Sequence, residues 1–233
     1  VANLGAALAA AGLDTCLVDM DPQGHLTLHF DIDPNTAAPS IYEVLIGQAT
    51  LSMAAERIAR TLCVLPASPD LAAAPSEISD ESGWEYRLRN ALRAASDLPH
   101  EYVLIDCPPS LGALTINSLV AAGNIIIPLQ PHFLAMHGLA SLLDTIVGIK
   151  EHLNPDLKVA GIVFCMYETI TRLSGDITDE ISNFIDAARN TDMPWADARL
   201  FETAIRRNIR LAECPSHGQT IFDYDPRCHG AID

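Results

Sequence analysis

Acidic residues at the ends of two apolar segments are the side chains in this sequence best suited to chemistry. Residues 15–18 are followed by Asp19 and then by Asp21, and residues 102–105 are followed by Asp106. A carboxylate at the end of a buried strand loses its hydration, which costs free energy unless a cation or a hydrogen-bond donor contacts it. If the two segments are strands of one parallel sheet, the three carboxylates gather at one edge, where a Mg²⁺ ion could balance their charge.

The residues that follow the first strand have the composition of a short switch loop. Pro22 fixes the backbone directly after Asp21, and Gly24 frees it again, which suits a loop that presents a carboxylate to a water molecule. Four apolar residues followed by Asp106 are typical of the Walker-B aspartate, which holds Mg²⁺ in P-loop NTPases. For Asp106 alone a simple turn is an equal alternative, because an aspartate two residues before a proline is also a natural turn sequence.

Short apolar runs alternate with helical stretches along the chain, and the strands lack polar alternation. This pattern predicts an α/β fold, a doubly wound, mainly parallel sheet with helices on both faces, in one domain over 1–233. Ligands of such sheets bind beyond the carboxyl ends of the strands. We expect strands over 15–19, 62–66, 102–106, 124–129, 158–166 and 201–205, and helices over 2–11, 40–60, 83–96, 112–122, 134–152 and 173–189.

Composition excludes several classes of protein. The 233 residues are 49% hydrophobic and carry a formal charge of −16, which excludes global disorder and a surface-wide nucleic-acid binder, although not a local basic patch. The longest apolar runs, such as 124–129, are far shorter than the roughly 20 residues of a membrane span. Six cysteines without a C-x-x-C pair favour reduced thiols over a disulfide framework. His25 and His29 have helical spacing, but no further ligand follows them, so a metal site there is disfavoured.

The chemistry-bearing segments resemble a known family. Val-Asp-Met-Asp-Pro-Gln-Gly at 18–24 and Leu-Ile-Asp-Cys-Pro-Pro-Ser-Leu at 104–111 are similar to the two switch segments of the ParA/Soj partition ATPases, cousins of MinD with a deviant Walker A motif. Further similarity covers nearly the whole chain in order. It lies at 64–67, 160–163, 166–167 and 207–218.

The resemblance implies a P-loop-NTPase-like domain that is cut at both ends. The family's phosphate loop, Lys-Gly-Gly-Val-Gly-Lys-Thr-Thr, and the strand before it should precede Val1, and a C-terminal helix should follow Asp233. Without that loop the chain has no anion cradle at a helix N-terminus and no lysine for the phosphates. We therefore expect the printed chain not to hydrolyse ATP, whereas the intact protein would be a Mg²⁺-dependent ATP hydrolase.

The resemblance also implies roles for individual residues, with ATP and Mg²⁺ as cofactors. Asp21 matches the catalytic aspartate that orients or activates the attacking water. Asp106 matches the Walker-B residue at the metal, and Asp19 matches a carboxylate near the Mg²⁺ shell that acts through water. Pro108 would hold the second switch rigid beside the nucleotide. Two more cofactor-binding residues are implied near the adenine, Arg207 and Asn208.

The resemblance further implies an ATP-dependent homodimer that segregates plasmid or chromosome DNA with a ParB-like centromere-binding protein, in the cytoplasm or on the nucleoid. Non-specific DNA binding would require surface arginines, which are scarce in so acidic a chain. A MinD-like positioning ATPase on the membrane is an alternative, but it needs a basic amphipathic C-terminal helix, and we expect no membrane contact. A non-catalytic scaffold without the phosphate loop is a third reading. The candidate DNA-binding residues are Arg189, Arg199, Arg206, Arg210 and Arg227.

Overall fold

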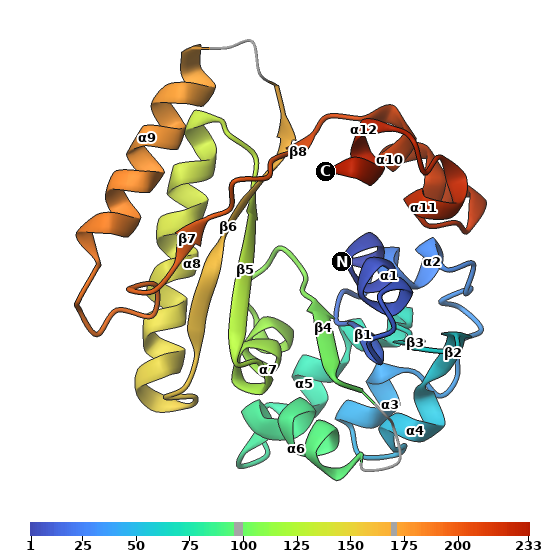
Figure 1. The fold of residues 1–233 in the computed structure, drawn as a ribbon. Coiled ribbons are helices and arrows are strands. Elements are labelled where there is room, and N and C mark those ends of the chain that lie inside the picture. Colours follow the sequence, from blue (N-terminus) through green and yellow to red (C-terminus); the bar gives the residue numbers. More distant parts are fainter. Residues whose placement is uncertain (96–99, 169–171) are drawn as a thin grey trace. The chain divides into compact units, whose positions relative to one another are not determined.

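The computed structural model describes residues 1–95, 100–168 and 172–233. The chain divides into two compact units (Figure 1). The first unit contains 1–121 and 212–224, and the second contains 122–211 and 225–233. Each unit has its own sheet, so the single domain expected over 1–233 stays a prediction.

The first unit is built on a four-stranded sheet in the order β2-β3-β1-β4. Its parallel strands are β1 (Thr15–Asp19), β3 (Leu62–Leu65) and β4 (Tyr102–Asp106), at or within one residue of the segments that the apolar runs predict. The fourth strand, β2 (Glu56–Ala59), runs antiparallel to β3 at the edge. The carboxyl ends of β1 and β4 therefore point the same way.

Buried side chains on both faces of β1 explain why this strand is apolar throughout. Successive side chains of a strand point to opposite faces, so Leu17 lies on one side and Val18 on the other. Leu17 packs with Ala2 of the N-terminal helix α1 (Ala2–Ala10), and Val18 belongs to a larger core that contains Leu88 of α6 (Arg87–Ala94). Helices therefore cover both faces of this sheet, as predicted.

The prediction of a single helix over 40–60 is wrong. The segment forms α3 (Ile41–Leu45), α4 (Leu51–Ala54) and then β2. Gly47 adopts the left-handed conformation (φ +79°) just after α3, which ends the first helix. Every residue of β2 is exposed, so this edge strand lacks the apolar run by which the other strands of this sheet were recognised.

The second unit contains the parallel strands β5 (Asn124–Leu129), β6 (Lys158–Tyr167) and β7 (Arg199–Leu200), with β8 (Ile205–Arg206) also paired to β6. The strands expected at 124–129 and 158–166 are confirmed. The strand expected over 201–205 is wrong, because the exposed Glu202 and Thr203 leave the sheet between two short pairings.

Long helices accompany this second sheet. Helix α8 (Phe133–His152) connects β5 to β6, and α9 (Arg172–Ala187) follows β6 (Figure 1). Leu139, Leu143 and Ile146 of α8 are buried and lie at helical spacing, so they form the side of this helix that faces the core. Within the described ranges, no helix has both the length and the apolar character that a membrane crossing needs.

The remaining helices of the two units are short. They are α2 (His25–His29), α5 (Ala74–Ile78), α7 (Ala113–Ala121), α10 (Ile209–Glu213), α11 (Ile221–Tyr224), α12 (His229–Ile232), and the 3₁₀ turns η1 (Pro69–Ala72), η2 (Trp84–Tyr86) and η3 (Cys214–His217).

The close approach of β6 and β7 gives a test of this packing. A Cβ added at Gly161 would lie 2.3 Å from the carbonyl oxygen of Arg199 and 2.8 Å from the ring of Phe201. Backbone cannot yield as a flexible side chain does, so Gly161→Ala should lower the free energy of unfolding by about 1–3 kcal/mol. Urea denaturation followed by circular dichroism measures the change.

Gly148→Ala is the matched control within the same unit. Gly148 lies inside α8, and a Cβ there meets no atom within 4 Å. Alanine is the better helix former, so this variant should be neutral or more stable by up to about 1 kcal/mol. Equal stability losses in the two variants would contradict the packing described for Gly161.

Candidate functional site

The register of β1 and β4 brings the three predicted acids to one edge of the first sheet. Asp19 is the direct strand partner of Asp106, and the Met20 N–H donates a hydrogen bond to the Asp106 carbonyl oxygen at 2.9 Å. Asp21 follows at once, and its negative charge raises the pKa of Asp106. The expectation that Asp19, Asp21 and Asp106 share one edge is therefore confirmed.

Asp19 is fully buried (0% exposed) and is held by three hydrogen-bond donors. Its Oδ1 accepts from the Asp21 N–H at 3.2 Å, and its Oδ2 accepts from the N–H and the hydroxyl of Thr27 at 2.8 and 2.6 Å. Burial raises the pKa of Asp19, and the Asp106 charge raises it further, whereas the bonds from Thr27 lower it; burial prevails. The carboxylate is thus fixed in place by its own chain.

Thr27 is a site residue that sequence reasoning missed. Its hydroxyl donates to Asp19 and accepts a hydrogen bond from the N–H of Ala67, which follows β3, at 2.9 Å. Thr27 lies in α2 and is fully buried, so one side chain joins the helix after the loop to two strand ends. A polar residue between Leu26 and Leu28 was the only sequence signal for it.

The loop between β1 and α2 has the geometry predicted from its proline and glycine. The Asp21 Oδ1 accepts from the Gln23 N–H at 2.9 Å, and the Asp21 carbonyl accepts from the Gly24 N–H at 2.9 Å. Gly24 has φ +64°, and a Cβ at this position would lie 2.9 Å from Pro34. Only glycine meets both demands, and the resulting turn leaves the Asp21 carboxylate half-buried at the edge of the sheet.

Asp106 differs from Asp19 because no described residue donates a hydrogen bond to its carboxylate. Burial raises its pKa and the charge of Asp21 raises it further, whereas the N-terminal amino group and His25 lower it; burial prevails. A half-buried carboxylate next to two other acids, without a donor of its own, suits a hard cation such as Mg²⁺.

The residues at this edge fit Mg²⁺: Asp106 could hold the ion directly, and Asp19 could act through water because its oxygens already accept hydrogen bonds. Magnesium uses one or two carboxylates and completes its shell with water and phosphate oxygens. No group of three or more acidic, histidine or cysteine side chains in the described part of the chain forms a complete metal site by itself.

The remaining predicted site residues lie elsewhere in their units. Pro108 is half-buried in the loop after β4. Arg207 and Asn208 belong to the second unit and directly precede α10. The Arg207 guanidinium lies 3.2 Å from a carboxylate oxygen of Glu168, and Asn208 Oδ1 accepts from the Arg210 N–H at 2.8 Å. Their contact with a nucleotide stays a prediction.

The candidate DNA-binding arginines are mostly engaged within the second unit. Arg189 lies 3.6 Å from Asp186, Arg210 lies 3.6 Å from Asp225, and Arg206 pairs with Asp233. Arg199 stacks over the ring of Phe201, 5.1 Å from its centroid. Three of these five side chains are therefore accompanied by a carboxylate, which reduces the positive potential that they present.

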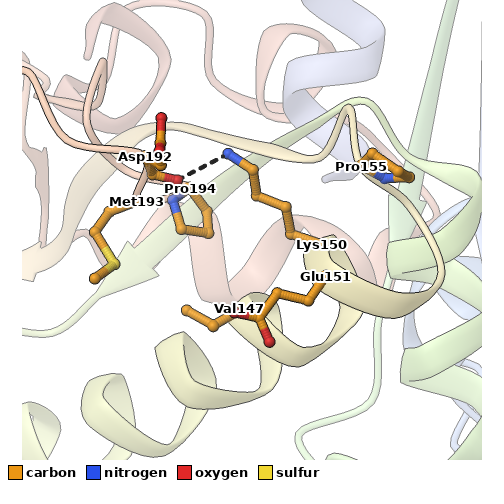
Figure 2. A pocket seen from close by; sticks show the side chains of 7 residues that line it. All are labelled: Val147, Lys150, Glu151, Pro155, Asp192, Met193 and Pro194. Atoms are coloured by element: carbon orange, nitrogen blue, oxygen red, sulfur yellow. Dashed lines mark hydrogen bonds between the residues drawn. The ribbon is translucent and has the colours of Figure 1, made fainter.

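A cavity of about 320 Å³ lies in the second unit beside the end of α8 (Figure 2). Figure 2 shows the Lys150 ammonium reaching across it to donate to the Asp192 carbonyl oxygen at 3.1 Å. None of the predicted site residues lines it, so this cavity is separate from the chemistry described above. Its lining consists of Val147, Lys150, Glu151, Pro155, Asp192, Met193 and Pro194.

The contrast between Asp106 and Asp19 predicts opposite effects of the same substitution. Because its folded-state pKa is raised above 3.8, ionisation of Asp106 costs stability as the pH rises from 3.8 through the raised pKa. Asp106→Asn removes that cost, so the variant should be more stable than the parent at pH 7, and the difference should disappear below pH 3.8. Thermal unfolding across pH 3–8 measures the effect.

Asp19→Asn is the paired control for this measurement. An amide here would direct its N–H₂ group at donors that now serve the carboxylate, so the variant should lose about 2 kcal/mol at pH 7. A stability loss of equal size in both variants would contradict the difference between the two carboxylates.

Comparison with known proteins identifies the family of this chain. Residues 1–159 match a family model described as an AAA domain. The chain is 38% identical over 229 residues to the chromosome partitioning protein ParA of Myxococcus xanthus, covering 98% of this chain and 77% of that protein. It is 37% identical over 230 residues to the sporulation initiation inhibitor protein Soj of Bacillus subtilis, covering 98% and 86% of the two chains.

Solved structures show the same fold. A protein titled cobyrinic acid a,c-diamide synthase from Mycobacterium smegmatis, solved with an ATP analogue and magnesium, is 35% identical with a TM-score of 0.80, covering 100% of this chain and 83% of that one. MinD of Pyrococcus horikoshii, 19% identical with a TM-score of 0.71 over 99% of this chain and 84% of that one, shares the fold alone. The predicted doubly wound α/β class is confirmed, and the chain belongs to the ParA/Soj family of chromosome-partitioning ATPases.

Proposed function

We propose that this chain forms most of an ATP-dependent switch for DNA segregation, with Mg²⁺-dependent ATP hydrolysis at the carboxyl edge of the first sheet. The observation that carries the proposal is the meeting of Asp19, Asp21 and Asp106 at that edge. Phosphoryl transfer needs positioning and charge neutralisation more than covalent chemistry, and carboxylates held in this way supply both. A relative 35% identical to this chain has been crystallised with an ATP analogue and magnesium, and also with ADP and magnesium, which supports the cofactors.

The three carboxylates have different tasks in this proposal. Asp106 contacts the Mg²⁺ ion, which neutralises phosphate charge when bound, and Asp19 orients the water molecules around it. Asp21 accepts a hydrogen bond from the attacking water and orients it, because its turn holds the backbone while the carboxylate stays half-exposed. Pro108 restrains the loop after Asp106, and Arg207 and Asn208 contact the adenine.

The partners proposed are a second copy of the chain when ATP is bound, a ParB-like centromere-binding protein, and non-specific DNA, with the protein in the cytoplasm or on the nucleoid. The names of the relatives that are 37–39% identical support a partition role. The charge of −16 and the paired arginines limit DNA binding by one copy, and dimerisation would double any small patch. The MinD-like alternative rests on a likeness of fold at 19% identity and is therefore weaker.

Asp21→Ala in the full-length gene product tests the assignment. The substitution removes the group that orients water and leaves Asp106 in place, so hydrolysis should fall at least about 100-fold. Binding of a fluorescent ATP analogue should change by no more than about threefold, because the lost contact is one to water rather than to the nucleotide. Phosphate release and fluorescence titration measure the two quantities.

Asp33→Ala is the control because Asp33 repeats the local structure of Asp21. It also precedes a proline, and its Oδ1 accepts from the N–H of Asn35 at 3.0 Å, but it is exposed and lies outside the acidic edge. Hydrolysis should survive this change. Unchanged turnover in Asp21→Ala, or an equal loss in both variants, would overturn the role proposed for Asp21.

A further inference from the structure

Two buried cysteines face each other across adjacent strands of the first sheet. Cys16 of β1 is the direct register partner of Cys63 of β3, and both belong to the same apolar core. They are 1% and 7% exposed. Within the part of the chain that the structure describes, this is the one strand register that pairs two cysteines.

The spacing of the strands permits a bond between these two sulfurs. Neighbouring strands lie about 4.8 Å apart, and disulfides join residues whose Cα atoms are about 4.4–6.8 Å apart. Because Cys16 and Cys63 are directly opposite and on the same face, the sulfurs can meet by side-chain rotation, without a shift of the sheet. All six cysteines are free thiols in this structure, so the pair is in its reduced form.

The surroundings make the two thiols unequal. The Cys16 thiol lowers the pKa of Cys63, as does the charge of Arg57, which is the register partner of Cys63 in β2; burial and Asp14 act in the opposite direction. The pKa of Cys16 is raised by its hydrogen bond to Cys63 and by burial. Cys63 is also the more exposed of the two residues (7% against 1%), and only the exposed edge strand β2 lies beyond it in the sheet, so an oxidant meets Cys63 first.

We propose that Cys16 and Cys63 form a reversible disulfide site that is oxidised by small peroxides. The Cys63 thiolate attacks one oxygen of hydrogen peroxide; the O–O bond breaks and leaves a sulfenic acid and hydroxide, which takes up the thiol proton as water. The Cys16 sulfur then loses its proton and attacks the Cys63 sulfur, the S–O bond breaks, and a second water leaves. Two thiols and one peroxide thus give one disulfide and two waters, and a thiol reductant reverses the change.

A small peroxide is the oxidant proposed because the two residues are only 1% and 7% exposed. Hydrogen peroxide is small and neutral, so its approach needs less opening of the core than that of a bulky disulfide. The bond would tie together the strand that ends at Asp19 and the strand that leads to Ala67, the two segments that Thr27 already bridges. The oxidised state therefore restrains the frame on which the acidic edge is built.

Peptide mapping of the peroxide-treated folded protein tests the proposal directly. Trypsin cleavage at Arg57, Arg60 and Arg87 places Cys16 in peptide 1–57 and Cys63 in peptide 61–87, and the other four cysteines fall in other peptides. Free thiols are blocked with N-ethylmaleimide before digestion without reductant. The expected result is one dominant cross-link, between 1–57 and 61–87, which dithiothreitol releases.

Single substitutions separate the attacking sulfur from the resolving one. Cys16→Ala should stop the reaction at the Cys63 sulfenic acid, which dimedone traps when urea opens the protein after the peroxide has been removed. Cys63→Ala, treated in the same way, should leave Cys16 without a dimedone adduct. Cys107→Ala removes an exposed thiol of the same unit and should leave the cross-link unchanged. Circular dichroism verifies the fold of each variant, and the result for the unmodified chain stands whether or not a variant folds.

Two results would overturn the proposal. One is oxidation of the exposed Cys107 while peptides 1–57 and 61–87 stay separate. The other is a cross-link that forms no faster in the folded protein than in urea, where strand register no longer holds the sulfurs together. The readout is a covalent bond and not a turnover rate, so it does not depend on the function proposed above.

Discussion

The hydrogen bonds around Thr27 are the constraint on which the acidic edge depends. A fully buried carboxylate is costly unless donors surround it, and Asp19 receives two of its three hydrogen bonds from this one residue. The same hydroxyl accepts from Ala67, so the positions of β1, α2 and the segment after β3 are set together. Because α2 begins directly after the loop that carries Asp21, fixing the helix also fixes the end of that loop.

The edge combines the Asp19 carboxylate, which accepts three hydrogen bonds, with the Asp106 carboxylate, which accepts none from a described residue. Asp19 receives hydrogen bonds from three donors and serves as a rigid support, although burial still raises its pKa, whereas Asp106 meets burial and a neighbouring negative charge without a described donor. Functional sites typically contain charged groups that lower the stability of the folded protein when no ligand is bound and that a bound ligand stabilises. The stability of the unit is thus lower than its packing permits, and the difference lies where a cation would bind.

Sequence reasoning found most of the fold because most strands are buried on both faces. An apolar run such as β1 has few alternative structures. Because each of two such runs ends in an aspartate, the sequence was enough to predict that Asp19 and Asp106 meet. It failed at β2, where exposed residues such as Arg57 resemble the polar face of a helix. It also missed Thr27 and the pairing of Cys16 with Cys63, since these contacts join residues that only the folded register brings together.

The exposed edge strand β2 has a consequence for how the sheet ends. One long side of β2 has no strand neighbour in the described sheet, and such an edge invites addition of a foreign strand. Charged Glu56 and Arg57 together with a register irregularity between Arg57 and Ala59 interrupt the regular array of backbone groups that an incoming strand would need. The exposed charged residues that concealed this strand in the sequence therefore also protect the protein against edge-to-edge aggregation.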